Sequence, residues 1–220
     1  MTPALVLFDL DGTLVDSAPD IARALAAALA ETGIDSPPLE VVKRMVGDGA
    51  RQLVRRALLA ARRSDPALEE AVFGRFLASY RDNVCVDTRL YPGVEAGLAS
   101  LRAGGAALAV ITNKPGDMAR ALLRRLGVAA ELEAIIGDGD GFPRKPDPAA
   151  ALSVLERVGA SPADTVVVGD GLPDMRLGRA LGALTIAAAW GYVAAADLQA
   201  EGPALLAGSF EVAVSAIRRR

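Results

Sequence analysis

The chain has 220 residues, of which 52% are hydrophobic and 23% charged, and its formal net charge is −3. It contains one cysteine and no histidine, which excludes nucleophilic sites that depend on histidine and the usual zinc sites built from histidine and cysteine. The mild negative charge argues against nucleic acid as the main partner. The length suits one large domain, or a core with a smaller inserted domain.

The sequence also lacks the features of a membrane or secreted protein. No apolar run is long enough to span a bilayer, so we expect no membrane partner. The first residues lack the basic flank and the long apolar run of a secretory signal. Cys85 cannot form an internal disulfide, which fits a reducing cytoplasm. We therefore expect a cytoplasmic protein, and nothing in the sequence decides between a monomer and a homodimer.

Strand-like and helix-like segments follow one another along the chain. Residues 4–8 form a short apolar run, which predicts a buried strand, and residues 20–81 show only helical patterns. From residue 90 onward the two types alternate. The predicted strands are residues 106–111, 134–136, 165–168 and 184–188. The predicted helices are residues 93–103, 115–126, 148–158, 173–181 and 210–217. Such alternation is typical of βα units and a parallel sheet.

We therefore predict an α/β fold, a doubly wound parallel sheet with a Rossmann-like core, into which a small all-helical domain is inserted. The predicted core comprises residues 1–17 and 88–220, and the inserted domain comprises residues 18–87. Open parallel sheets bind ligands beyond the carboxyl ends of their strands. The residues that follow each strand are therefore the first candidates for a functional site.

Four connections on this predicted sheet edge carry residues that bind phosphate or metal ions in other proteins: Asp9 and Asp11, Thr112–Lys114, Lys145, and Asp170 and Asp174. Neighbouring carboxylates repel each other unless a cation or a shared proton intervenes, and they are ligands that Mg²⁺ prefers. A helix N-terminus attracts anions, and a fixed lysine stabilises negative charge. Each motif alone is also explained as an ordinary turn or helix cap. Together they predict a carboxylate, magnesium and lysine cradle for a phosphoryl group.

On these motifs the chain resembles the haloacid-dehalogenase superfamily, in its Asp-x-Asp-Gly-Thr phosphatase branch. Within that superfamily it is similar to the bacterial phosphoglycolate phosphatase group. The segments that carry this closer similarity are residues 8–17, 46–50, 90–94, 112–115, 144–148 and 191–192. The helical insertion looks like the helical cap of that family.

The resemblance implies a role for each motif. Asp9 would be the nucleophile and form an aspartyl-phosphate, and Asp11 would act as general acid and then as general base. Thr112 and the backbone N–H of Asn113 would bind the phosphoryl oxygens. Lys145 would neutralise charge on the nucleophile and the phosphoryl group.

The resemblance also implies a Mg²⁺ cofactor. Asp9, the backbone carbonyl of Asp11 and Asp170 would bind the ion, and Asp174 would bind it directly or orient its water ligands. The implied reaction is hydrolysis of a small phosphorylated metabolite, with 2-phosphoglycolate as the first candidate. Other small phosphomonoesters such as sugar phosphates remain open. A phosphosugar mutase on the same scaffold and a catalytically idle binding module are the alternatives.

Substrate specificity would come from the inserted helices. Arg51 follows the segment Gly47–Ala50 and could bind the carboxylate of a small acid. The alternative, a surface arginine on a cap helix, is equally consistent with the sequence. We interpret Trp190 and Tyr192 as packing residues.

Overall fold

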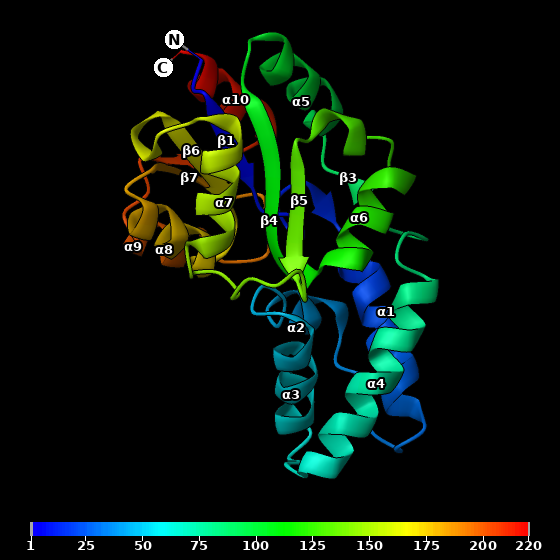
Figure 1. Cartoon of the computed structure of the whole chain (residues 1–220). Coiled ribbons are helices and arrows are strands. Elements are labelled where there is room, and N and C mark those ends of the chain that lie inside the picture. The colour runs from blue at the N-terminus through cyan, green and yellow to red at the C-terminus, as the bar shows by residue number, and fades with distance from the viewer. Residues whose placement is uncertain (1, 220) are drawn as a thin grey trace.

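The core of the molecule is a six-stranded parallel sheet covered by helices on both faces (Figure 1). The computed structural model describes residues 2–219, so residues 1 and 220, the ends of the predicted core, lie outside the described part. The strand order is β5-β4-β1-β6-β7-β8. The strands are β1 (Leu5–Phe8), β4 (Ala107–Pro115), β5 (Ala134–Asp138), β6 (Thr165–Gly169), β7 (Leu184–Ala188) and β8 (Leu205–Ala207). The predicted α/β fold with a parallel sheet is confirmed.

Both faces of the sheet are buried because helices connect successive parallel strands. The helices of the core are α5 (Val94–Ala103), α6 (Gly116–Arg125), α7 (Ala149–Val158), α8 (Leu172–Leu181), α9 (Ala195–Ala200) and α10 (Phe210–Arg218), of which α10 follows the last strand, with 3₁₀ turns at η1 (Ala129–Glu131) and η2 (Pro162–Asp164). In β1, Val6 and Phe8 join the core formed with α5, α6 and α10, whereas Leu5 and Leu7 join the core formed with α7 and α8. This alternation fixes the register of the central strand.

Four further helices lie beyond the carboxyl ends of the strands, in the lower part of Figure 1. They are α1 (Ala18–Ala30), α2 (Leu39–Lys43), α3 (Ala50–Ala60) and α4 (Pro66–Asp82). Helix α4 packs against both α1 and α3. Its N-terminus is capped by the Asp65 side chain, which accepts a hydrogen bond from the Ala67 N–H.

The chain enters and leaves these four helices through two adjacent segments. Strands β2 (Val15–Asp16) and β3 (Arg89–Leu90) form a short antiparallel pair there. Next to this pair, the buried carboxylate of Asp20 accepts backbone hydrogen bonds from Val86 (2.8 Å), Asp87 (2.9 Å) and Thr88 (2.9 Å). The two segments are therefore joined by side-chain as well as strand contacts.

The structure extends the predicted elements in several places. Strand β4 runs past residue 111 to Pro115, with a register shift between Ile111 and Pro115. The short strand β8, helix α9 and the β2–β3 pair lack a sequence signal of their own, because runs of two to six residues give too little periodicity. Within residues 2–219, no helix has the length and apolarity needed to cross a bilayer.

Candidate active site

Three buried acids gather where β1 and β6 end. Asp9 follows β1, and Asp170 and Asp174 lie after β6 and in the first turn of α8. One carboxylate oxygen from each lies within 4.8 Å of the others. They meet because β1 and β6 are neighbouring parallel strands, so their carboxyl ends share one edge of the sheet.

Lys145 lies against this acid cluster. Its Nζ atom is 2.7 Å from Oδ1 of Asp9 and 2.6 Å from Oδ1 of Asp174. Burial alone would lower the pKa of Lys145, but the negative charges of Asp174 and Asp9 outweigh burial and raise it. The side chain therefore places a permanent positive charge between two carboxylates.

Asp170 and Asp174 are each held by specific donors. The Thr13 hydroxyl donates to Asp170 Oδ1 (2.8 Å) and the Tyr192 N–H donates to Asp170 Oδ2 (2.8 Å). The Gly171 N–H donates to Asp174 Oδ2 (2.9 Å), so Asp174 is also the acid of a helix cap. Burial, and next the charge of Asp9, raise the pKa of Asp170 to about 8 and that of Asp174 to about 7.

Glycine is required beside Asp170. Gly12 has φ +85°, and a Cβ atom there would overlap the Asp170 carboxylate. A Cβ at Gly191 would overlap the same side chain. The backbone therefore approaches this acid more closely than other residues would permit.

The donor set fits a hard divalent cation. Asp9, Asp11, Asp170 and Asp174 face only two ammonium groups, those of Lys114 and Lys145, as counted in the described residues. Buried carboxylates whose oxygens lie within 4.8 Å of one another repel each other, and burial and this repulsion raise the pKa of Asp170 and of Asp174. A cation of charge +2 would balance the two excess negative charges, and oxygen ligands are those that Mg²⁺ prefers.

Asp11 is held apart from the acid cluster by its own partners. The Ser17 hydroxyl donates to Asp11 Oδ1 (2.5 Å), and Lys114 Nζ lies 2.8 Å and 3.1 Å from the two carboxylate oxygens. Lys114 also donates to the Tyr80 hydroxyl on α4. Burial opposes the charge of Lys114, but Asp11 and Tyr80 outweigh it and raise the pKa of this lysine.

Thr112 and Asn113 are buried at the end of β4. The Thr112 hydroxyl accepts a hydrogen bond from the Lys114 N–H (3.2 Å). The Asn113 amide donates to the Gly47 carbonyl (3.0 Å) and accepts from the Lys145 N–H (2.9 Å). Neither side chain caps α6, so the alternative of ordinary N-capping is wrong for this segment.

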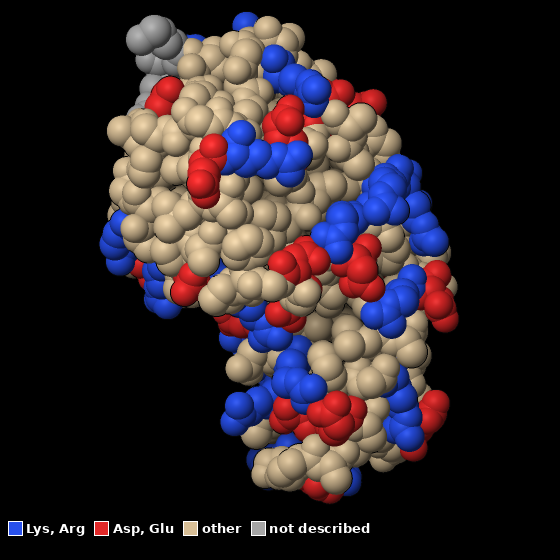
Figure 2. Space-filling model, in the orientation of Figure 1, with Lys and Arg blue, Asp and Glu red and all other residues tan. Residues whose placement is uncertain are grey.

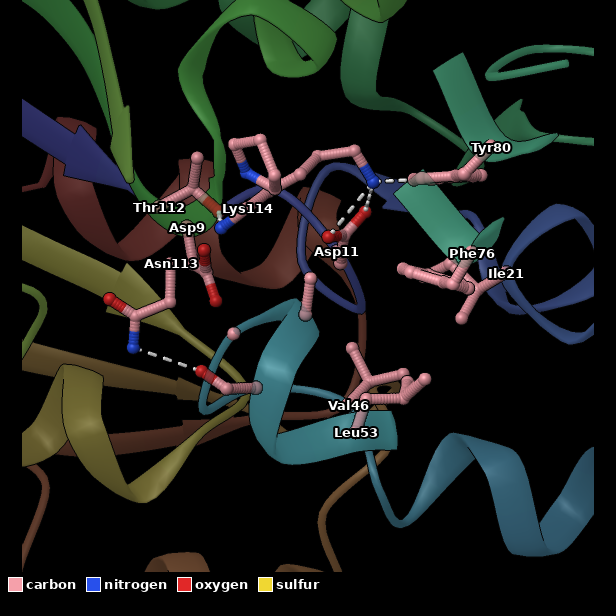
Figure 3. A pocket seen from close by; sticks show the side chains of 14 residues that line it. Asp9, Asp11, Ile21, Val46, Leu53, Phe76, Tyr80, Thr112, Asn113 and Lys114 are labelled. Atoms are coloured by element: carbon pink, nitrogen blue, oxygen red, sulfur yellow. Dashed lines mark hydrogen bonds and ion pairs between the residues drawn. The ribbon is translucent and has the colours of Figure 1, made fainter. Parts of the chain in front are cut away.

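These side chains border a cavity of about 40 Å³ between the sheet edge and the four helices (Figure 3). Its walls come from three places: Asp9 and Asp11; Thr112–Pro115; and Ile21, Val46, Gly47, Gly49, Ala50, Leu53, Phe76 and Tyr80 of the helical region. One wall is therefore polar and carries the acids, and the facing wall is largely apolar.

Arg51 lies elsewhere. It is not among the described residues that line the cavity. Its guanidinium is 2.7 Å from Glu70 on α4 and lies over the Phe73 ring, 4.1 Å from the ring centroid. Because α3 packs against α4, these contacts hold Arg51 on the outer surface. Figure 2 shows acidic and basic side chains interleaved on that part of the molecule. The structure thus agrees with the surface alternative.

Several residues of this site were not assigned a role from the sequence. Lys114 and Thr13 lie inside recognised motifs, and the rarity of lysine in the chain, with three residues, was a usable signal for Lys114. Tyr80 has no local signal. Tyr192 does more than pack, since its hydroxyl donates to Asp16 Oδ1 (2.8 Å) and accepts from the Ser17 N–H (2.9 Å).

Comparisons with known proteins agree with this geometry. A family model for haloacid dehalogenase-like hydrolases matches residues 3–182. A protein of Neisseria meningitidis named phosphoglycolate phosphatase is 43% identical over 190 residues, which are 85% of this chain and 80% of that protein. A protein of the same name from Pseudomonas putida is 40% identical over 208 residues, which are 93% of this chain and 76% of the other.

Solved structures show the same fold. The crystal structure of a predicted phosphoglycolate phosphatase from Haemophilus somnus superposes with a TM-score of 0.90 at 27% identity and covers 98% of both chains. The matched family model spans most of the described chain and includes every acid of the cluster. The resemblance read from the motifs is confirmed: the chain belongs to the haloacid dehalogenase-like hydrolase family.

Proposed function

We propose that this chain is a magnesium-dependent phosphatase that hydrolyses 2-phosphoglycolate to glycolate and phosphate. The observation that carries the proposal is the buried contact of Lys145 with Asp9 and Asp174, beside Asp170, at the sheet edge. The names of the relatives from Neisseria meningitidis and Pseudomonas putida support the choice of substrate.

In the first step, the Asp9 carboxylate attacks phosphorus. The bond between phosphorus and the bridging oxygen breaks, and the carboxyl group of Asp11 gives its proton to that oxygen. Asp9 is well suited to attack because its position after the central strand is fixed, with its backbone N–H bonded to the Val168 carbonyl (2.9 Å). Lys145 and the Thr112 hydroxyl stabilise the charge on the transferring group.

In the second step, Asp11 accepts a proton from a water molecule as that water attacks the phosphorus of aspartyl-phosphate. The bond between Asp9 and phosphorus breaks, which restores the Asp9 carboxylate and releases inorganic phosphate. Ser17 and Lys114 hold Asp11 in place for both proton transfers. One carboxyl group thus serves as acid and then as base.

A Mg²⁺ ion would be held by Asp9, Asp170 and the backbone carbonyl of Asp11, with Asp174 beside them. When bound, the ion supplies positive charge that offsets the negative charge of the phosphoryl group and of the buried acids. Thr13 and Tyr192 orient Asp170 toward it from the protein side.

We also propose that helices α1–α4 act as the cap, with residues 18–87 as the inserted domain and residues 1–17 and 88–220 as the core. The cavity between them, about 40 Å³, has room for about three water molecules. A substrate with an entire phosphate group needs more room, so the helices would move away from the sheet edge to admit it. The single cysteine is consistent with a cytoplasmic location.

A phosphate-release screen of small phosphomonoesters with Mg²⁺ tests the proposal, with no bisphosphate activator present. We expect 2-phosphoglycolate to give the highest kcat/KM, and Asp9→Asn to lower kcat by about 10³-fold or more. Asp35→Asn, an exposed acid on the helical region, is the matched control and should retain activity. Near-normal release by Asp9→Asn would refute the nucleophile, and phosphate release that requires a sugar bisphosphate would indicate a mutase.

A further inference from the structure

The ammonium group of Lys114 lies in the wall of the cavity. Its side chain is only 2% exposed, and of the described residues that line the cavity it alone carries a positive charge. An ammonium group has three protons to donate. Asp11 and Tyr80 are its partners, and Asp11 is shared with Ser17. Lys114 is therefore a buried cation whose main counter-ion, Asp11, also accepts a hydrogen bond from Ser17.

The wall that faces Lys114 is apolar. Ile21, Val46, Leu53 and Phe76 form it, and Figure 3 shows these side chains grouped on the side of the cavity toward the helices. Apolar surroundings weaken the screening of charges, so a cation and an anion attract each other more strongly there than in water. A neutral polar group gains much less at the same place. Once a divalent cation balances the excess negative charge of the acids, the cavity therefore favours a ligand with a negative charge near Lys114.

The position of Lys114 matches one part of the proposed substrate. Asp11 must touch the bridging oxygen to protonate it, and Lys114 touches Asp11. In 2-phosphoglycolate the carbon bonded to the bridging oxygen also carries the carboxylate. The carboxylate therefore lies beside the Asp11 side chain, within reach of the Lys114 ammonium. We propose that Lys114 binds this carboxylate and that Tyr80 positions the ammonium, so that the pair selects phosphomonoesters with an adjacent anionic group.

Tyr80 is suited to the positioning role. It is buried, and its ring stacks on Phe76 with 5.6 Å between centroids and an interplanar angle of 19°. Its hydroxyl accepts from Lys114 Nζ and thereby fixes the end of a flexible side chain. Because Tyr80 belongs to α4, selection depends on the helices being packed against the sheet edge. This assignment replaces Arg51, whose guanidinium is already paired with Glu70.

The inference rests on the proposed function, and a binding experiment tests it without turnover. Two non-hydrolysable ligands are compared by calorimetry with Mg²⁺ present. The first is 3-phosphonopropionate, in which a methylene replaces the bridging oxygen of phosphoglycolate. The second is 3-hydroxypropylphosphonate, in which a neutral alcohol replaces the carboxylate.

We expect the wild type to bind the carboxylate ligand at least about tenfold more tightly than the alcohol, since a hydrogen bond between charged groups discriminates by that order. Lys114→Gln should remove this preference and leave the affinity for the alcohol within about threefold. Tyr80→Phe should reduce the preference by about threefold or more. Lys43→Gln, a lysine paired with Glu40 on α2, is the matched control and should leave it intact.

Two results would overturn the inference: a wild type that binds both ligands equally, or Lys114→Gln and Tyr80→Phe variants that weaken both ligands by the same factor. The second result would mean that Lys114 only supports Asp11. If Lys114→Gln does not fold, Tyr80→Phe decides, because Phe keeps the stacked ring. Preference for the carboxylate ligand without turnover of 2-phosphoglycolate would refute the proposed function and leave the role of Lys114 standing.

Discussion

Replacing Asp20 by Asn tests the connection between the helical region and the core. The carboxylate oxygens of Asp20 accept from the N–H groups of Val86, Asp87 and Thr88, from the Thr88 hydroxyl (2.7 Å) and from Arg23. Asn has the same shape but only one acceptor oxygen. Its NH₂ group must therefore face donors that the carboxylate satisfies.

The size of the effect follows from the hydrogen bonds that the amide loses or weakens. With the amide oxygen directed toward Val86 and Thr88, the Asp87 N–H keeps only its longer bond of 3.1 Å, and the Arg23 guanidinium loses Asp20 but keeps the Asp87 carboxylate. The lost bond between charged groups costs about 1.5–3 kcal/mol and the weakened bond adds to this, so we expect a loss of about 3 kcal/mol. For a chain of this size that lowers Tm by about 6–12 °C.

The effect should depend on pH in a definite direction. Burial alone would raise the pKa of Asp20, but the hydrogen bonds from Thr88, Asp87 and Val86 outweigh it and lower the pKa below its ordinary value of 3.8. A group with a lowered folded pKa stabilises the fold above its ordinary pKa, and that stability is lost as pH falls through the folded value. The difference between wild type and Asp20→Asn is therefore largest near neutral pH and shrinks in acid.

Urea denaturation at neutral and acidic pH measures this difference. Asp87→Asn is the matched control, because the Asp87 side chain is 56% exposed and pairs with the same Arg23, while its backbone N–H remains bonded to Asp20. An exposed ion pair of this kind contributes less than about 1 kcal/mol. Equal losses in the two variants, or a difference that grows in acid, would refute the reasoning.

Three further changes test the acid cluster and its supports. When Mg²⁺ is absent, Asp170→Asn should leave Tm unchanged or raise it. The variant should also lack the increase in Tm that Mg²⁺ causes in the wild type; a full increase would contradict the metal site. Gly12→Ala should cost about 2 kcal/mol or more in thermal denaturation, whereas Gly105→Ala, also at positive φ but with open space around it, should cost less; similar losses would exclude the overlap with Asp170. Asn113→Ala leaves the Lys145 N–H without its acceptor and should destabilise the fold by about 1–3 kcal/mol in urea; unchanged stability would show that this bond is dispensable.

The sequence was sufficient for the parallel sheet and for the grouping of its motifs. Apolar runs such as residues 165–168 predict buried strands without further information, and parallel strands bring their carboxyl ends to one edge. Lys145 accordingly lies within hydrogen-bond distance of both Asp9 and Asp174, although the roles of the three residues stay predictions. Local patterns sufficed here because the geometry of a parallel sheet brings the residues that follow each strand together at one edge.

The contacts of the inserted helices could not be predicted in the same way. Tyr80 reaches Lys114, and Glu70 reaches Arg51, only because of how α4 packs against its neighbours. Helical periodicity shows which face of a helix is apolar but not which other helix covers it. The sequence therefore predicted a specificity residue in this region, and tertiary packing decided that Arg51 points outward.

The central position of β1 has a consequence for the order in which the chain can fold. Leu5 pairs with Ala107 in β4 and with Thr165 in β6, about 100 and 160 residues further along the chain. During synthesis β1 emerges first, yet both of its neighbours are still to be made, so the apolar segment Leu5–Phe8 waits without a partner. Long-range pairing of this kind slows folding and prolongs the exposure of aggregation-prone intermediates. Strand β1 can therefore be paired along both edges only after β6 has left the ribosome.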